Sequence, residues 1–336
     1  MFDNFAQRRQ LLSAATALAL AASAVVGSAS AQTPEAAGVK PAGFPDKPVR
    51  LVVPFQPGSP PDILARTIGP SLSARIGQPV VIENRAGANG NIGTENVANS
   101  PPDGHHYVVC GITCATADVF YKNLRFDMRK DLLPVINFGV YPIVLIVSVN
   151  SQFKNPQELL EYLKNNPGTA YASYGRGGSP HMAAEQLRAL AKVDLTHVPF
   201  GSSDPLMDVA AQRVTFMFMP AATANAKKDL VRSLAVASAQ REPQLPDLPT
   251  MDELGLKGFR MEAWNALWAP KGTPADRLDY MNRQINAVLN EPEIRAKFTS
   301  HGMRIIGGTR AQLLEYHNQD NKRWHEVAKA TGIQPE

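Results

Sequence analysis

Short apolar segments of strand character alternate with helical segments along most of this 336-residue chain. A strand pattern at residues 50–55 precedes a helical pattern at 62–76, and a second strand pattern at 169–173 precedes a helical pattern at 180–191. Strands that alternate with helices of about ten residues are typical of sheets covered by helices, because each helix returns the chain to the next parallel strand. The sequence therefore predicts an α/β fold with mostly parallel sheets.

The same alternation continues through the rest of the chain. Two of the strand patterns, at 143–149 and 263–269, are placed so that each could cross from one lobe of the fold to another. The region from residue 275 onward is expected to be mostly helical. Further strand patterns lie at 80–83, 107–110, 135–138, 194–199, 214–219 and 231–237, and further helical patterns at 157–164 and 204–211. A turn at 87–93 is expected to lead into a helix that runs to about residue 98, and a helix or turn is expected around 115–121.

The first residues have the character of an export signal. Arg8 and Arg9 precede an apolar stretch at 11–26, and Ala29-Ser30-Ala31 is a small-residue cleavage pattern. We expect cleavage after Ala31, a periplasmic mature protein and a Pro/Ala/Gly linker at 32–45. The paired arginines leave Sec and twin-arginine export open.

Charge and hydropathy exclude two classes of protein. The formal net charge is +4, and no run of five basic residues is present, so the sequence gives no support to nucleic-acid binding. No segment after the signal has eighteen or more consecutive apolar residues. We therefore expect a mature chain that does not span a membrane.

The chain has two cysteines, Cys110 and Cys114. In an oxidising compartment they could form a disulfide, but so short a loop gains little stability and needs suitable geometry. We favour two free thiols, with the disulfide as the alternative. Because no second pair of ligands stands at zinc-binding spacing, no metal site is expected.

Two similar turns follow two of the strand patterns. Residues 57–60 read Pro-Gly-Ser-Pro and residues 177–180 read Gly-Gly-Ser-Pro. Serine is a good N-cap and proline is tolerated at a helix start, so each turn predicts the beginning of a helix. Free N–H groups and the helix dipole suit a bound anion at such a position. The alternative is ordinary helix capping, which also explains the helix starts at 155–158 and 272–276.

Motifs of catalysis and cofactor binding are missing or incomplete. The glycines at 87–93 lack the dinucleotide-binding pattern, and no Gly-x-Ser-x-Gly turn is present. His325-Glu326 begins like a zinc-protease motif, but Lys329 stands where the second histidine would be needed. We expect no cofactor and no enzyme activity, with a periplasmic hydrolase as a remote alternative.

The chain resembles the Bug (TctC-like) family, the periplasmic solute receptors of tripartite tricarboxylate transporters. The resemblance follows the sequence in order over nearly the whole mature chain. The matching stretches are residues 44–58, 62–66, 77–88, 91–93, 102–104, 197–200, 234–238, 248–250 and 269–274.

The resemblance implies a two-lobed periplasmic binding protein fold, a clamshell of type II, in which each lobe is a mixed, mostly parallel sheet flanked by helices. We expect residues 46–142 and 265–336 to form lobe 1, and residues 143–264 to form lobe 2. The implied ligand is a small organic acid. The implied partners are membrane permease subunits, or alternatively a signalling protein, and a monomer is expected.

In the family, the ligand is held by the loop after the first strand and by the Gly/Ser-rich loop of the second lobe. Here these correspond to residues 55–62 and 174–181. Prolines 60, 61 and 180 remove N–H donors from both loops, and Met219 stands where many members have a carboxylate. These departures favour an aromatic or aliphatic mono- or dicarboxylate over an amino acid, with Arg176 pairing a second carboxylate.

The expected ligand-binding residues come from these two loops and from neighbouring strand ends. Asp62 and His181 have structural alternatives, as a helix-start carboxylate and as a partner of the backbone, and Trp264 could equally be a core residue. The complete set is Phe55, Pro57, Gly58, Ser59, Asp62, Thr113, Cys114, Tyr174, Gly175, Arg176, Gly177, Gly178, Ser179, His181, Phe200, Met219 and Trp264.

Overall fold

The computed structural model describes residues 40–200 and 204–335. The expected export signal at 1–31 and the linker up to residue 39 lie outside the described residues. The last part of that expected linker, residues 40–45, is packed against the fold. Phe44 is fully buried, and its ring makes edge contacts with His105 at 5.0 Å and Tyr280 at 6.0 Å between centroids.

The centre of the fold is one long strand, β4 (Leu132–Ser148), of 17 residues. The sequence predicted two separate strands here, because prolines interrupt the apolar pattern, and this prediction is wrong. The register of β4 against β9 (Glu262–Pro270) shifts just after Pro134, as expected where a missing N–H interrupts a ladder. Pro142 lies where β4 leaves β9 and begins to pair with another strand, so it too interrupts little of the ladder.

One half of the sheet contains β4 up to Pro142 together with β9. Strand β1 runs parallel to both β2 and β3, whereas β3 runs antiparallel to β9, and β4 runs antiparallel to β9 and β10. A short strand that the sequence analysis missed, β10, also pairs with β4. The further strands of this half are β1 (Val49–Val53), β2 (Val80–Asn84), β3 (His106–Gly111) and β10 (Arg304–Gly307).

The other half uses the remaining part of β4, from Ile143 to Ser148. Here β4 pairs antiparallel with two strands, and the outer strands of this half run parallel to one another. The order of strands across both halves is β2-β1-β3-β9-β4-β7-β5-β6, with β8 and β10 paired to β4 outside that path. The strands of this half are β5 (Thr169–Ser173), β6 (Leu195–Pro199), β7 (Phe216–Pro220) and β8 (Val231–Val236).

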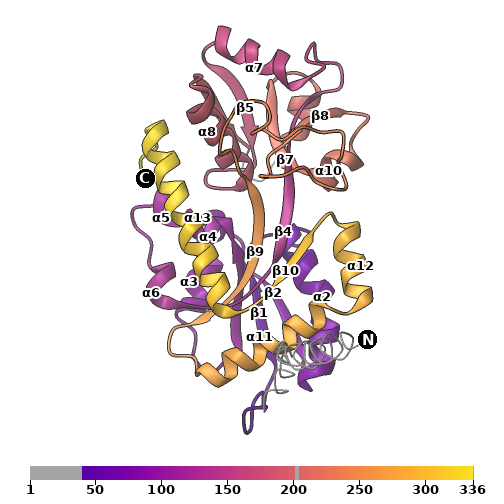
Figure 1. The fold of residues 1–336 in the computed structure, drawn as a ribbon. Coiled ribbons are helices and arrows are strands. Elements are labelled where there is room, and N and C mark those ends of the chain that lie inside the picture. The colour runs from indigo at the N-terminus through magenta and orange to yellow at the C-terminus, as the bar shows by residue number, and fades with distance from the viewer. Residues whose placement is uncertain (1–39, 201–203, 336) are drawn as a thin grey trace, which may run out of the picture. The chain divides into compact units, whose positions relative to one another are not determined.

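Helices cover both halves, and the chain passes between the halves along β4 and β9 (Figure 1). The longest helix, α13 (Arg310–Thr331), belongs to the C-terminal segment but contacts α8 of the second half as well as α4 of the first. The other helices are α2 (Pro60–Ile76), the short 3₁₀ turn η1 (Ala88–Gly90), α3 (Asn91–Ala98), α4 (Ile112–Ala115), α5 (Ala117–Phe120), α6 (Met128–Asp131), α7 (Pro156–Asn165), α8 (Ser179–Ala191), α9 (Leu206–Ala210), α10 (Ala221–Ala226), α11 (Ala275–Leu289) and α12 (Pro292–Ser300).

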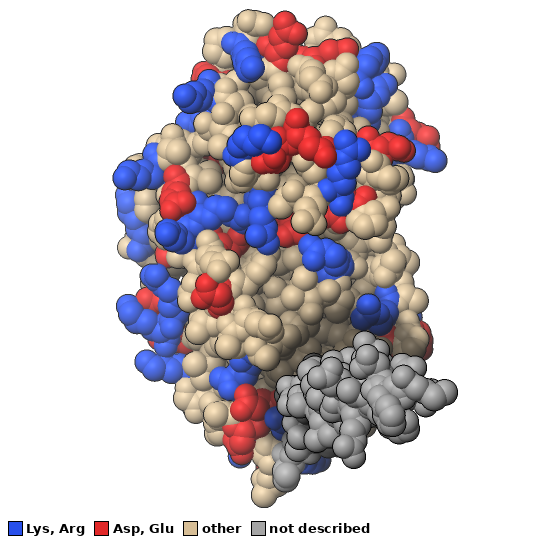
Figure 2. Space-filling view, viewed as in Figure 1, with Lys and Arg blue, Asp and Glu red and all other residues tan. Residues whose placement is uncertain are grey.

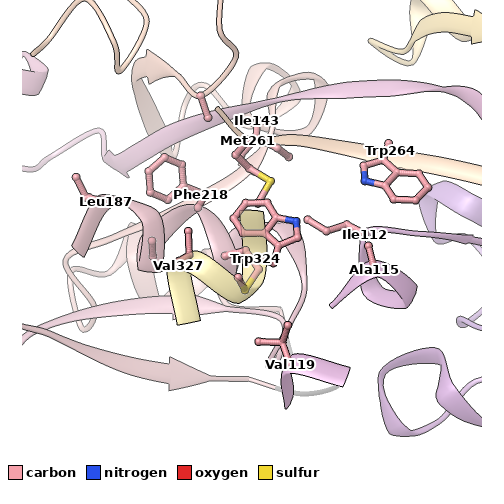
Figure 3. Close-up of a cluster of buried hydrophobic side chains, with 14 of the residues drawn as sticks. Ile112, Ala115, Val119, Ile143, Leu187, Phe218, Met261, Trp264, Trp324 and Val327 are labelled. Atoms are coloured by element: carbon pink, nitrogen blue, oxygen red, sulfur yellow. The ribbon is translucent and has the colours of Figure 1, made fainter. Parts of the chain in front are cut away.

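The largest hydrophobic cluster contains residues from both halves of the sheet. Trp324 of α13 lies next to Met261 and Ile112, and Phe218 and Leu187 of the second half belong to the same cluster (Figure 3). Burying apolar area here contributes about 25 cal/mol per Å². The helix α13 is therefore held by a core that both halves share.

A buried carboxylate fixes α13 against β9. Oδ2 of Asp320 accepts hydrogen bonds from the indole N–H of Trp264 at 2.8 Å and of Trp324 at 2.9 Å, and Oδ1 accepts from Arg323. Both indoles are at most 1% exposed and Asp320 is 5% exposed. Because buried polar groups are costly without partners, these bonds specify how the helix meets the strand.

Within residues 40–200 and 204–335, no helix combines the length and the apolar character needed to cross a membrane. On the face shown in Figure 2, acidic side chains lie among the basic ones and leave no continuous basic surface.

We predict that Asp320→Ala lowers the free energy of unfolding by about 3 kcal/mol, since two buried indole N–H groups lose their acceptor at roughly 1–3 kcal/mol each. Urea denaturation would measure this. The control is Asp279→Ala, which removes an ion pair at 2.8 Å from a half-exposed carboxylate and should have a much smaller effect. Equal losses from the two variants would contradict the role of Asp320.

Candidate functional site

The first loop, residues 55–62, joins β1 to α2 as the sequence predicted. Ser59 is the N-cap residue, and its carbonyl accepts the first helical hydrogen bond from the Ile63 N–H at 2.9 Å. Its hydroxyl makes no capping bond and is buried without a hydrogen-bond partner among the described residues. Pro60 and Pro61 occupy the first positions of the helix, where the lack of N–H groups is tolerated.

The buried carboxylate of Asp62 holds this loop in its conformation. It is 2% exposed, and it accepts hydrogen bonds from the Gly58 N–H at 2.9 Å, from Asn84 at 2.8 Å and from Arg66 at 3.0 Å. Burial alone would raise the pKa of Asp62, but these hydrogen bonds outweigh it and hold the pKa below its ordinary value. Its carboxylate oxygens are occupied by the fold, so the expected ligand contact from Asp62 is replaced by a structural role.

The second loop, residues 174–181, joins β5 to α8. The cap of this helix is Gly178, whose carbonyl accepts from the Met182 N–H at 3.0 Å. The sequence predicted Ser179 as the cap, which is wrong by one residue. Gly178 has the extended backbone of a cap (φ −75°, ψ 164°), and Pro180 is then tolerated in the first turn of the helix.

A network of hydrogen bonds holds the second loop in place. The Ser173 hydroxyl donates to the Gly175 carbonyl at 3.0 Å and accepts from the Gly175 N–H at 3.1 Å. Nε2 of His197 lies 2.7 Å from the same hydroxyl, within hydrogen-bond distance. The Gly177 N–H donates to Nδ1 of His181 at 3.1 Å.

The two histidines of this network stack on each other, with ring centroids 4.1 Å apart. Burial, followed by the nearby charge of Arg176, lowers the pKa of His197 to about 4. Burial also holds the pKa of His181 well below its ordinary value, and the neighbouring His197, Arg176 and Arg188 lower it further. Both rings are therefore neutral near pH 7, which keeps Nδ1 of His181 available as the acceptor for Gly177.

The second loop also contacts the first half of the sheet directly. Asn89 donates to the carbonyl of Arg176 at 2.7 Å, and Thr116 donates to the carbonyl of Gly177 at 2.9 Å. The ring of Phe120 lies 5.2 Å from that of His181. These contacts bring the Gly-rich loop of one half against α5 and the turn η1 of the other.

The turn η1 is the link between the two loops. Ala88 and Asn89 have left-handed backbone (φ 45° and 53°), an uncommon conformation for residues other than glycine. Gly90 lies against the ring of Phe55 from the first loop, since a Cβ added there would be 3.3 Å from that ring. One side of η1 thus borders the first loop, while Asn89 reaches the second.

The cysteines form a disulfide, with 6.0 Å between their Cα atoms. The preference for two free thiols is therefore wrong, because β3 ends and turns into α4 so that residues four apart face each other. Cys114 is 4% exposed and Thr113 is half-buried. The hydroxyl of Thr94 lies 3.5 Å from the sulfur of Cys114, so Cys114, a predicted site residue, is packed into the interior at α4.

Two other expected ligand contacts are core residues. Met219 is fully buried in β7 among the apolar side chains of Val144, Ile146 and Ala172. Trp264 is 1% exposed and donates its indole N–H to Asp320. Both side chains lie in the interior because, where helices cover both faces of a sheet, successive side chains of a strand are buried on one face or the other.

The remaining predicted residues lie on the two loops or beside them. Tyr174 is 40% exposed and Arg176 is exposed, whereas Gly177 and His181 are buried. Phe200 is partly buried, and its N–H donates to the Ser173 carbonyl at 3.0 Å. The others, Pro57, Gly58, Gly175, Gly178 and Ser179, are exposed or half-buried backbone-rich positions of the loops.

Sequence reasoning missed several residues that position the loops. Asn84 is the last residue of β2 and Asn89 lies in the turn after it, and the sequence signal was the glycine-rich turn that contains Asn89. Ser173 ends β5 and His197 lies in the middle of the neighbouring parallel strand β6, and they can be placed near each other only once the order β7-β5-β6 is known. Among the described residues, no group of three or more His, Cys, Asp or Glu side chains could hold a metal ion.

The model of the tripartite tricarboxylate transporter family receptor matches residues 64–333. Over 289 residues, the chain is 37% identical to the UPF0065 protein in the tcbD-tcbE intergenic region of Pseudomonas sp. (strain P51), covering 84% of this chain and 86% of the relative. It is 32% identical to Protein BugT of Bordetella pertussis, covering 92% and 97%.

Solved structures of periplasmic binding proteins have a similar fold. The periplasmic binding protein BugD is 32% identical, with a TM-score of 0.78 over 87% of this chain and 100% of that one. Rpa4515 of R. palustris with adipate is 31% identical, with a TM-score of 0.80 and the same coverage. MatC of Rhodopseudomonas palustris with bound malate is 30% identical, with a TM-score of 0.75 over 84% and 99%. The expected two-lobed fold is confirmed.

We predict that Gly177→Ala weakens the contact between the second loop and the first half. An added Cβ would lie 2.9 Å from Phe120 and 3.2 Å from the Thr116 hydroxyl, and the backbone is left-handed (φ +77°). We expect a loss of about 2 kcal/mol or more in the free energy of unfolding, from backbone strain plus overpacking.

The matched control is Gly258→Ala, which has the same backbone strain (φ +78°) but no atom within 4 Å of the added Cβ. Thermal denaturation of both variants separates strain from collision. If Gly258→Ala is as destabilising as Gly177→Ala, the packing between the second loop and Phe120 has no energetic importance.

The buried histidine pair predicts a pH dependence of stability. Unfolded histidine has a pKa near 6.5, and His197 in the fold has a pKa of about 4, so between these values the unfolded chain binds more protons. The free energy of unfolding should therefore fall as the pH drops from 6.5 towards 4, by up to about 1.4 kcal/mol per pH unit for each ring.

Chemical denaturation at several pH values tests this. His197→Gln should reduce the slope, whereas His301→Gln, at an exposed position, should leave it unchanged. A slope that is the same in the wild type and in His197→Gln would contradict the assignment to this pair.

Proposed function

The chain belongs to the tripartite tricarboxylate transporter receptor family, and we propose that it is a solute-binding receptor for a small organic carboxylate. The carboxylate is supported by two relatives of 30–31% identity whose structures are described with adipate and with malate. The family consists of periplasmic binding proteins, in keeping with the export signal expected at residues 1–31.

The observation that carries the proposal is the pairing of two backbone-rich loops at helix starts. The first loop ends in α2 and the second ends in α8, and the turn η1 contacts both. Free N–H groups at helix N-termini favour an anion, and each charge–dipole interaction is worth roughly 0.3–1 kcal/mol at an exposed position. A carboxylate bound between the loops would use donors from both halves of the fold.

The composition of the loops favours an acid without an ammonium group. The one acidic residue in 55–62 and 174–181 is Asp62, and its carboxylate is occupied by Arg66, Asn84 and the Gly58 N–H. A ligand ammonium would therefore find no free carboxylate on these loops. Met219 does not distinguish between ligands, because its side chain is buried in the core.

Prolines 60, 61 and 180 limit the number of backbone donors, so we infer that Arg176 supplies the second anion contact. Its positive charge already acts on this region, since it lowers the pKa of His197. A planar guanidinium pairs well with a carboxylate. An aliphatic or aromatic dicarboxylate fits this arrangement, and a monocarboxylate would use the loop donors alone.

The proposed partner is the membrane permease of a tripartite tricarboxylate transporter, with a monomeric receptor delivering the ligand. A signalling protein that recognises the ligand-bound receptor is the second candidate. The two candidates share the same binding site, so they differ in the protein that recognises the bound form. We propose no catalytic role, since the described loops contain no nucleophile oriented by a base and an acid.

A thermal-shift screen of organic acids tests the proposal. A ligand present at 100 times its Kd stabilises the native state by about 2.7 kcal/mol, so adipate, malate or a related acid should raise the melting temperature by several degrees. If no acid in the panel shifts the melting temperature while the protein hydrolyses an ester or a phosphate monoester, the receptor function is contradicted.

We predict that Arg176→Ala weakens adipate binding at least tenfold, because one carboxylate loses its charged partner, and weakens hexanoate binding much less. The two acids have the same carbon chain and differ in the second carboxylate. Calorimetric titration measures both. Arg213→Ala, in an exposed ion pair with Asp208 at 2.5 Å, is the control and should change neither affinity. Equal losses for the two acids would remove the proposed role of Arg176.

A further inference from the structure

A cavity of about 660 Å³ lies away from the two loops, between α13 and the segment from α5 to α6. It shares no residue with 55–62 or 174–181. In Figure 1 the helices α5, α6 and α13 lie on the same side of the fold. Its volume is within the range of small-molecule sites, roughly 300–1,000 Å³.

A buried histidine, His317, lines one wall of this cavity, and its ring nitrogens could form hydrogen bonds. His317 of α13 is 2% exposed, and neither of its ring nitrogens makes a hydrogen bond of good geometry among the described residues, although the adjacent side chain of Asn318 is a polar neighbour that acts to raise its pKa. Its ring is held edge-on against Trp268, 5.1 Å between centroids. Buried polar atoms without partners are uncommon, because each costs roughly 1–3 kcal/mol, and this one lines a cavity.

The acidic side chains of the cavity wall are occupied by the fold. Asp118 accepts from Asn321 at 3.0 Å and lies 3.1 Å from the ring of His325. Asp127 caps α6 through the N–H of Arg129 at 2.9 Å and pairs with Lys130 at 2.9 Å. Asp131 accepts from the backbone N–H of Asp127 at 2.8 Å.

Three basic side chains of the same wall make no hydrogen bond to an acidic side chain of the described residues. Arg125 is 3.9 Å from Glu95, and Arg129 is 3.9 Å from Asp118, both beyond hydrogen-bond distance. Lys122 has no ion pair or hydrogen bond within residues 40–200 and 204–335. The cavity therefore combines surplus positive charge with an unused donor. Burial lowers the pKa of His317, so its ring is neutral and offers one N–H.

We propose that this cavity is a second binding site, which takes a small oxyanion through Lys122, Arg125, Arg129 and the N–H of His317. Phosphate and a carboxylate both carry negatively charged oxygens that accept hydrogen bonds from lysine, arginine and an imidazole N–H. The proposal does not depend on the site between the two loops. An oxyanion there would bridge the α5–α6 segment to α13, which in turn contacts the second half through the Arg188 side chain and the Thr331 carbonyl at 2.6 Å.

The test uses the ring ¹⁵N signals of the histidines in labelled protein, assigned with His317→Phe. Inorganic phosphate is added at constant ionic strength, with sodium chloride as the replaced salt, and sodium adipate is titrated in a second series. We expect a saturable shift of the His317 ring nitrogens with at least one of the two anions and no such shift with chloride. A linear response equal to that of chloride would overturn the proposal.

Substitutions of exposed side chains should leave the fold intact, so they test anion binding separately from folding. Arg129→Gln and Lys122→Gln should each weaken the anion response of His317 at least fivefold. The matched control is Arg213→Gln, since Arg129 and Arg213 have similarly exposed side chains (56% and 62%) and both lie near an aspartate. If Arg129→Gln and Arg213→Gln respond alike, the assigned cations do not bind the anion and the site is rejected.

The outcome can be separated from that of the proposed function. Calorimetric adipate binding between the two loops should be weakened at least tenfold in Arg176→Ala and unchanged in Arg129→Gln. A His317 response that persists in Arg176→Ala supports the second site even if no organic acid binds between the loops. A His317 response abolished by Arg176→Ala but not by Arg129→Gln would show that the signal reports the first site, and would overturn this inference.

Discussion

The hydrogen-bond ladder of β4 is the constraint on which the rest of the structure depends. This one strand pairs with β9 and β10 in one half of the sheet and with β7 and β8 in the other. The carboxyl ends of β1 and β5 are positioned by the halves that β4 joins. Open α/β sheets bind ligands at such strand ends, so the placement of the two loops follows from the topology.

Hydrogen bonds within each half then shape the loops before any ligand arrives. Asp62 accepts a hydrogen bond from the Gly58 N–H and so fixes the first loop. The second loop is fixed by the Ser173–His197 contact and by the hydrogen bond from the Gly177 N–H to His181. Asn89 and Thr116 hold the second loop against the first half through its carbonyls. The N–H groups of Gly58, Gly175 and Gly177 are used within the fold as well, so the other loop N–H groups and the charge of Arg176 are the parts of the loops that suit an anion. Preorganisation of this kind lowers the entropic cost of binding.

Local patterns in the sequence predicted much of this arrangement. The strand–turn–helix units at β1–α2 and β5–α8 were predicted from apolar runs followed by Gly-Ser-Pro, because these signals depend on neighbouring residues only. The continuity of β4 and the short strand β10 were missed, since the partner strands that stabilise them are distant in sequence. Met219 and Trp264 were assigned to the ligand for the same reason: their burial depends on helices packed from other parts of the chain. The disulfide depends on the turn between β3 and α4, which spacing alone does not determine.

A crystal structure of the protein with the dicarboxylate that stabilises it most would test the central claim most directly. The account predicts ligand density between residues 56–62 and 174–181, with one carboxylate at the loop N–H groups and the other within hydrogen-bond distance of Arg176. Density that lies only elsewhere, such as in the cavity beside His317, with the two loops unoccupied, would contradict it.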